Sequence, residues 1–136
     1  MTIELHVYIE VPDLERGIAF YRDGLELRLR RRFDATWAEL EGAAIPVFLL
    51  AGAPRLPATL AAPAAPFERH WTPVHLDIMT GDLDAVVQRA VAAGALLERD
   101  IRQRPWGRIA TLSDPFGNAF DLLEMGPRGY DVLLDG

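Results

Sequence analysis

The chain contains no cysteine among its 136 residues. This absence excludes disulfide bonds, thiolate metal ligands and a thiol nucleophile, so any bound metal must be held by His, Asp or Glu side chains. No apolar run approaches the roughly 20 residues that cross a bilayer. The N-terminus begins in an alternating pattern instead of a basic segment followed by an apolar one. We therefore expect a cytoplasmic protein with no membrane partner.

Positive charge is also scarce. Fourteen basic residues stand against twenty acidic ones, which gives a formal net charge of -6. This balance argues against a phosphate-binding surface, so we expect a small-molecule ligand and no nucleic acid as partner. Hydrophobic residues make up 50% of the chain and charged residues 25%, a composition that predicts one packed domain over residues 1–136.

The first part of the chain has the pattern of a strand, a helix and three short strands. Residues 3–11 alternate apolar and polar side chains, as a strand with one buried face does. Asp13 is placed to cap a helix that Asp23 and Gly24 end. Three strand-like runs follow, separated by turn residues. The predicted order of this first module, about residues 1–50, is βαβββ.

The same order returns after a connection rich in alanine and proline, residues 51–69. His6 and His75 are 69 residues apart, and Asp13 and Asp82 are separated by the same number. The second module spans about residues 70–125 and is followed by a tail, 126–136. A duplication of this size predicts an α+β fold in which two βαβββ modules pair into a single core. Small sheets leave edges to cover, so we also expect a homodimer.

The repeated residues resemble a known family. The doubled βαβββ unit, a histidine in the first strand of each module and Asp-Pro-Phe-Gly-Asn at 114–118 are similar to the vicinal oxygen chelate superfamily. Its members include glyoxalase I, bleomycin-resistance proteins, fosfomycin-resistance transferases and extradiol dioxygenases. The resemblance covers His6 to about Glu124. It implies the glyoxalase-like fold, in which the two βαβββ modules form a curved mixed sheet around one cavity, built within one chain or across two.

The resemblance also implies metal ligands on the first and last strands of each module. These positions correspond to His6, Leu49, His75 and Asp121. Three of them can bind a metal ion, and two imidazoles with one carboxylate leave positions open for substrate or oxygen. The family more often has Glu where this chain has Asp121. We predict a divalent ion, Fe, Mn, Zn, Ni or Co, held by His6, His75 and Asp121; the alternative is a hydrogen-bonded cluster that lines an empty pocket.

Leu49 cannot bind a metal ion, which leaves the ligand arrangement of glyoxalase I incomplete. The resemblance therefore favours the dioxygenase, lyase or thiol-transferase branches over glyoxalase I proper, that is, a metal-dependent enzyme acting on a small oxygenated substrate. The alternative is a metal-free protein of the bleomycin-resistance type, which binds and sequesters a bulky cationic or aromatic molecule without chemistry.

Further side chains are expected to line the substrate pocket. Strand alternation places some of them beside the histidines, and others are bulky enough to shape a cavity, although the aromatic ones also suit an ordinary core. Arg108 is the cation expected to face an anionic group of the substrate. The predicted pocket residues are Tyr8, Glu10, Trp37, Phe48, Leu49, Trp71, Asp77, Trp106 and Arg108.

Overall fold

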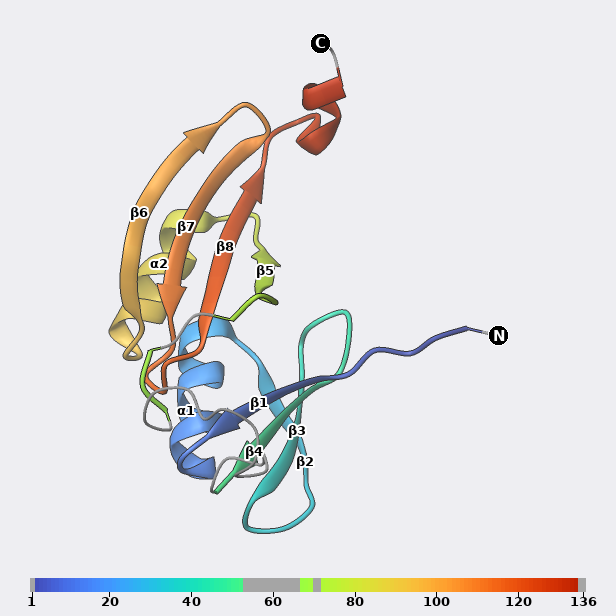
Figure 1. Ribbon diagram of the computed structural model, residues 1–136, viewed down its shortest axis with the longest axis vertical. Helices are drawn as coiled ribbons and strands as arrows, with labels where there is room; N and C mark the ends of the chain where they lie inside the picture. Colours follow the sequence, from blue (N-terminus) through green and yellow to red (C-terminus); the bar gives the residue numbers. More distant parts are fainter. Residues whose placement is uncertain (1, 53–66, 70–71, 135–136) are drawn as a thin grey trace.

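The computed structural model describes residues 2–52, 67–69 and 72–134, and its elements form two similar halves (Figure 1). The first contains β1 (Val7–Val11), α1 (Leu14–Leu25), β2 (Arg28–Arg32), β3 (Trp37–Glu41) and β4 (Val47–Ala51). The second contains β5 (Leu76–Met79), α2 (Leu83–Ala92), β6 (Leu96–Arg104), β7 (Gly107–Ser113) and β8 (Ala119–Met125). A short 3-10 helix, η1 (Gly129–Leu134), ends the described chain. The predicted α+β class with two βαβββ modules is confirmed.

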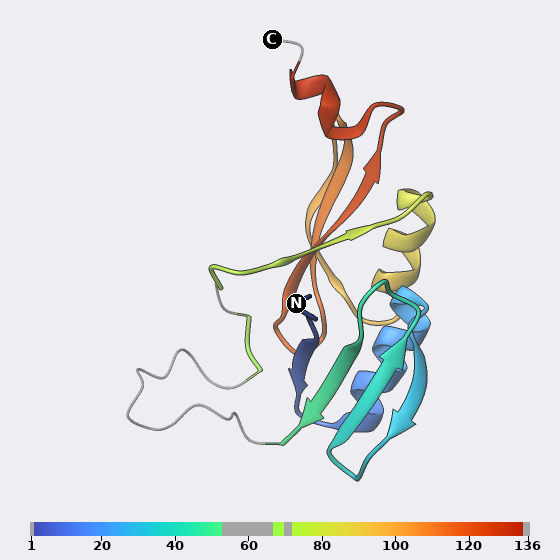
Figure 2. The same ribbon diagram turned by 90° about the vertical axis from the view of Figure 1, so that its right-hand side faces the viewer.

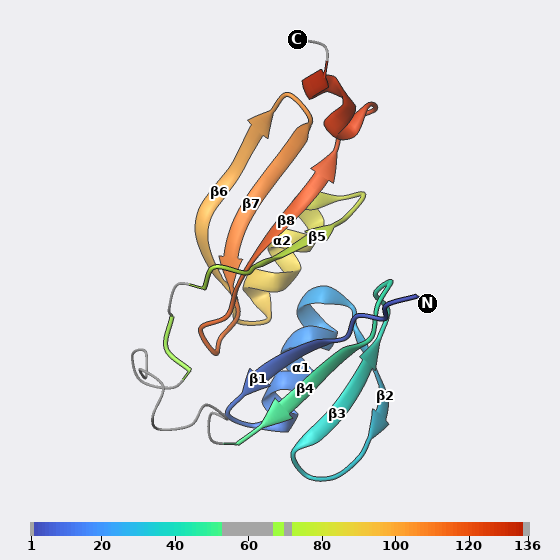
Figure 3. The same cartoon turned by 45° about the vertical axis from the view of Figure 1, so that its right-hand side comes forward.

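Each module forms its own four-stranded mixed sheet. The strand orders are β1-β4-β3-β2 and β5-β8-β7-β6, and within each sheet the first pair is parallel and the others are antiparallel. The two sheets stay separate in the single chain and lie one beyond the other (Figure 3). Strands β1 and β5 are therefore edge strands. Most of the connection predicted at 51–69 lies outside the described residues.

The two helices begin where the sequence predicts. The Asp13 carboxylate accepts a hydrogen bond from the N–H of Arg16 at 2.9 Å, and Asp82 accepts one from Ala85 at 3.2 Å. Helix α1 runs past its predicted stop at Gly24, because Glu26 adopts a left-handed conformation with φ 60° and its N–H closes the last turn. None of the helices in the described ranges is long and apolar enough to cross a membrane.

The helices pack against each other on one side of the molecule (Figure 2). Gly24 lies in this contact, where a Cβ atom would stand 3.3 Å from the Cβ of Ala93 and 3.4 Å from the Cα of Ala90. Apolar side chains from both sheets complete one buried cluster with the helices, including Leu49, Leu83, Leu112 and Leu122. The helix-facing sides of the two sheets thus share a core, and their other sides are left open for a site.

The turn between β7 and β8 joins the two modules. The buried Asp114 carboxylate accepts hydrogen bonds from the Tyr21 hydroxyl of α1 at 2.6 Å and from the N–H groups of Phe116 at 2.8 Å and Asn118 at 2.9 Å. The Asn118 side chain donates to the carbonyl oxygen of Glu10 at 3.2 Å. This Asp-Pro-Phe-Gly-Asn turn therefore stabilises the packing of the second module on the first.

Replacing Tyr21 by Phe is expected to lower the free energy of unfolding by about 1.5–3 kcal/mol, the usual value of a hydrogen bond to a charged group. Denaturant titration measures the loss. Tyr130→Phe is the matched control, because Tyr130 is 47% exposed and its ring packs on Trp106. Equal stability of the two variants would show that the Tyr21 hydroxyl does not hold the modules together.

Candidate functional site

The open face of the second sheet carries a row of polar side chains. In β8, Phe120 and Leu122 are buried in the core, so Asp121 between them points to the other face. The pairing of the strands places Asp77 of β5 on one side of Asp121 and Thr111 of β7 on the other. The sheet thus sets three polar side chains in one line.

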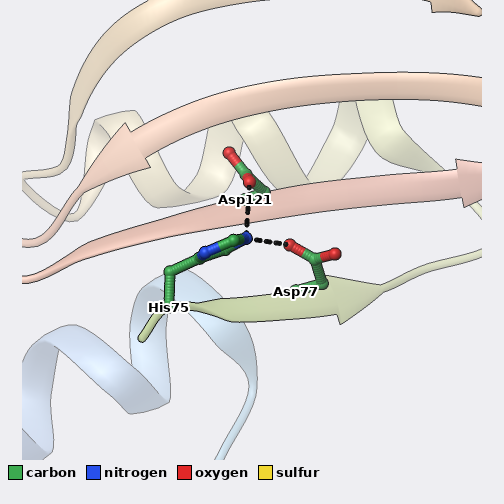
Figure 4. Close-up of side chains that lie close together, drawn as sticks. All are labelled: His75, Asp77 and Asp121. Carbon is green, nitrogen blue, oxygen red and sulfur yellow. Dashed lines mark ion pairs between the residues drawn. The ribbon is translucent and has the colours of Figure 1, made fainter. Parts of the chain in front are cut away.

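His75, Asp77 and Asp121 converge at the edge of this sheet (Figure 4). The His75 Nε2 atom lies 3.2 Å from Asp77 Oδ1 and 3.5 Å from Asp121 Oδ2, so both carboxylates face the same nitrogen. Among the described residues this is the group of His, Asp and Glu side chains whose ligand atoms all lie within 4.8 Å of one another. Nitrogen and oxygen donors of this kind suit a divalent first-row metal ion.

Two residues that sequence reasoning missed hold Asp121 in place. The Thr111 hydroxyl donates to Asp121 Oδ1 at 2.6 Å, and Arg102 Nη2 of β6 donates to the Thr111 oxygen at 3.3 Å. Since Oδ1 is occupied in this way, Oδ2 is the oxygen that faces His75. An open pocket of about 160 Å³ lies beside the group, lined by Arg69, Thr72, His75, Thr111, Ala119, Phe120 and Asp121.

The environment of Asp77 disfavours its charged form. Burial raises the pKa of the Asp77 carboxyl above its usual value, and the neighbouring Asp121 carboxylate raises it further, while His75 acts in the opposite direction. Two carboxylates that face one imidazole nitrogen repel each other, and either a proton on one of them or a cation between them relieves the repulsion. The group could therefore hold a metal ion.

His6, the other predicted imidazole ligand, lies in the first module and outside this group. Its ring lies 5.2 Å from that of Phe48, which in turn stacks on Tyr8 at 4.8 Å. Phe33 extends this cluster, at 6.4 Å from Phe48 and 4.2 Å from Trp37. We call these five side chains, His6, Tyr8, Phe33, Trp37 and Phe48, the aromatic face of the first sheet.

The structure corrects the position assigned to Leu49. The strand pairing sets Tyr8 opposite Phe48 in the first sheet, as it sets Asp77 opposite Asp121 in the second. Phe48 is thus the counterpart of Asp121, whereas Leu49 is 0% exposed and packs in the core. The conclusion that this position carries no metal ligand is unchanged, because Phe48 cannot bind a metal ion either.

Arg108 and Trp106 are not brought to the group around His75. The Arg108 guanidinium lies 2.9 Å from both Asp84 and Glu124, on the face of the sheet that α2 covers. Trp106 lies in the turn before β7, with its ring 5.3 Å from that of Tyr130. Glu10 contributes its carbonyl oxygen to the contact between modules, and Trp71 lies outside the described residues.

The fold and its sequence identify the family. A profile of the glyoxalase-like domain matches residues 6–123, so the chain belongs to this family, which is consistent with the vicinal oxygen chelate superfamily. No curated protein matches the chain.

Several solved structures have the same fold. A glyoxalase-related enzyme from Fulvimarina pelagi is 16% identical, with a TM-score of 0.69 over 95% of this chain and 96% of the other. The fosfomycin resistance protein FosX from Listeria monocytogenes is 18% identical, with a TM-score of 0.69 over 94% of this chain and 97% of the other. A mutant of FosX, 20% identical with a TM-score of 0.69 over 94% of each chain, was solved with Mn(II) and 1S,2S-dihydroxypropylphosphonic acid.

Proposed function

We propose that the protein is a cytoplasmic, metal-dependent enzyme of the vicinal oxygen chelate type that acts on a small oxygenated molecule. The observation that carries the proposal is the convergence of His75 and Asp121 beside an open pocket. These residues, with His6, would hold the ion. A bound divalent ion would supply Lewis-acid polarisation of a substrate oxygen, and the hydrogen bond from Thr111 would keep Asp121 oriented for it.

We propose further that His6 reaches this site from a second copy of the chain. Within one chain His6 lies outside the group around His75. Strands β1 and β5, which follow the two histidines, are both edge strands, and an edge presents backbone groups that a second chain can pair. The segment before β1 leads away from the body of the molecule with Ile3 81% and Leu5 67% exposed (Figure 1). A homodimer would cover these apolar side chains and complete the metal site.

The residues of the first module favour a metal-ligand set of two histidines and one carboxylate over the ligand set of glyoxalase I. Phe48 stands where the second module has Asp121. The carboxylate paired with Phe48 on the next strand, Glu39, is 2% exposed and bound by both Arg30 and Arg31. At the positions that correspond to the group around His75, the first module thus offers only His6 as a metal ligand. This favours the dioxygenase, lyase and thiol-transferase branches.

One observation favours a second function, the metal-free binding of a drug-like molecule. On the aromatic face, Tyr8 is 49% and Phe33 is 40% exposed. Stacked rings of this kind hold a flat aromatic or cationic ligand without chemistry. In a dimer this face and the group around His75 would line the same cavity, so both functions use one place in the molecule.

Metal analysis tests the first function. Protein purified without chelator is expected to contain close to one equivalent of divalent metal per chain, and His75→Ala is expected to lose most of it because an imidazole ligand is gone. Elemental analysis measures the content, and the melting temperature checks that the variant is folded. A wild-type metal content far below one equivalent that the substitution leaves unchanged would favour the metal-free function.

A further inference from the structure

We propose that Asp77 is also a metal ligand, so that β5 and β8 of a single chain bind a divalent cation through His75, Asp77 and Asp121 without a residue from another chain. This inference rests on the proposed metal-dependent function and adds to it a ligand that the family resemblance does not imply.

The distances in the group fit three ligands of one ion. Ligand atoms about 2.1 Å from an ion, at right angles to each other, are about 3 Å apart. His75 Nε2 lies 3.2 Å from Asp77 Oδ1 and 3.5 Å from Asp121 Oδ2, and the three atoms lie within 4.8 Å of one another. One ion can therefore contact all three side chains after small rotations.

The two carboxylates are positioned by the strands of the sheet. Asp77 and Asp121 are paired residues on the adjacent parallel strands β5 and β8. His75 precedes Asp77 by two residues, which in an extended segment places both side chains on the same face. Thr111 fixes one oxygen of Asp121 and leaves the other directed at His75. The ligand positions are thus set by the pairing of strands before any ion binds.

The charge around the group points to a cation as well. Several other carboxylates in the sheets pair with arginine: Glu39 with Arg31, Glu98 with Arg69, and Glu124 with Arg108. Within the described residues, the ion pairs of Asp77 and Asp121 are with His75, and none is with an arginine. Two carboxylate oxygens and one imidazole form an oxygen-rich set that suits Mn²⁺. We therefore choose Mn²⁺ as the probe.

Calorimetric titration with Mn²⁺ tests the role of Asp77. The His6→Ala variant serves as the parent protein, because it removes the histidine that a second copy is expected to supply. This variant is expected to bind Mn²⁺ still. Adding Asp77→Asn should weaken binding by at least about tenfold, because the loss of a group that supports a metal typically costs 10–100-fold. Asp131→Asn, which removes the same charge from η1, is the matched control and should change little.

A second comparison separates a ligand from a residue that only orients His75. Asp77→Asn is introduced into a His75→Ala protein: a direct ligand still lowers the Mn²⁺ affinity there, whereas a positioning residue has no further effect. Unchanged affinity in either background would overturn the assignment of Asp77. Loss of all binding in His6→Ala alone would overturn the claim that one chain suffices. A wild-type protein that binds no Mn²⁺ would instead contradict the metal-dependent function itself.

Discussion

A mixture of the His6→Ala and His75→Ala variants is expected to regain metal sites of wild-type affinity, which neither variant has alone. If each site takes His6 from one chain and His75 from the other, a mixed dimer contains one site in which both histidines are mutated and one in which both are intact. Random exchange of subunits in an equal mixture makes half of the dimers mixed, so about a quarter of the wild-type number of sites is expected. Counting the sites that bind metal with wild-type affinity after subunit exchange measures this fraction.

The controls of this experiment are each variant kept separate and a mixture of two preparations of His75→Ala. All three should lack sites of wild-type affinity, although His6→Ala is expected to keep the weaker sites formed within one chain. If the mixture of different variants behaves like these controls while light scattering shows a dimer, the two histidines do not share a site across chains. A monomer at micromolar concentration would contradict the homodimer itself.

The elements of the fold could be predicted because local chemistry decides them. Asp13 and Asp82 cap the two helices, and each cap is read from residues close in the sequence. The first strand is shorter than its alternating pattern, since it begins at Val7 although the pattern begins at Ile3. Side-chain alternation alone does not supply a neighbouring strand to pair with.

The correspondence between the residues of the two modules was harder to predict. A shift of one residue assigned the side chains of β4 to the wrong face of the sheet. The equivalent residues Phe48 and Asp121 are 73 positions apart in the sequence, whereas the correspondence of Leu49 with Asp121 assumed a separation of 72. The error arises because Glu39 precedes its paired residue Phe48 by nine positions, whereas Thr111 precedes its paired residue Asp121 by ten. A one-residue slip moves every side chain to the other side of the sheet.

Thr111 was missed although the sequence held a signal for it. The tight turn at 114–118 fixes how β7 and β8 pair, and that pairing places Thr111 beside Asp121. Arg102 could not be found in this way, because irregularities in the pairing of β6 with β7 interrupt the alternation between Leu97 and Arg102. The cation expected at the site, Arg108, forms ion pairs on the opposite face. Irregular strands therefore limit what alternation can predict about a site.

Replacing Asp121 by Asn is expected to separate the two proposed functions. Asn has the same shape and its amide oxygen can still accept the hydrogen bond from Thr111, so the fold and the pocket should persist. A neutral amide is a much poorer metal ligand than a carboxylate, so metal affinity should fall by at least about 10–100-fold and any metal-dependent turnover should fall with it. Asp121→Glu, which keeps the charge and restores the residue more usual in the family, should retain metal.

The measurement combines metal titration with a screen of catechols, 2-oxo acids and thiol adducts in the presence of Fe(II), Mn(II) or Ni(II). Loss of metal and turnover together in Asp121→Asn, with both kept in Asp121→Glu, is the result expected of the enzyme. The metal-free function predicts the reverse: no turnover with any metal, and thermal stabilisation by an aromatic or cationic ligand in EDTA that Asp121→Asn leaves intact. That second pattern would refute the enzyme, because in the metal-free function the stacked rings of the aromatic face would bind a flat ligand without help from Asp121.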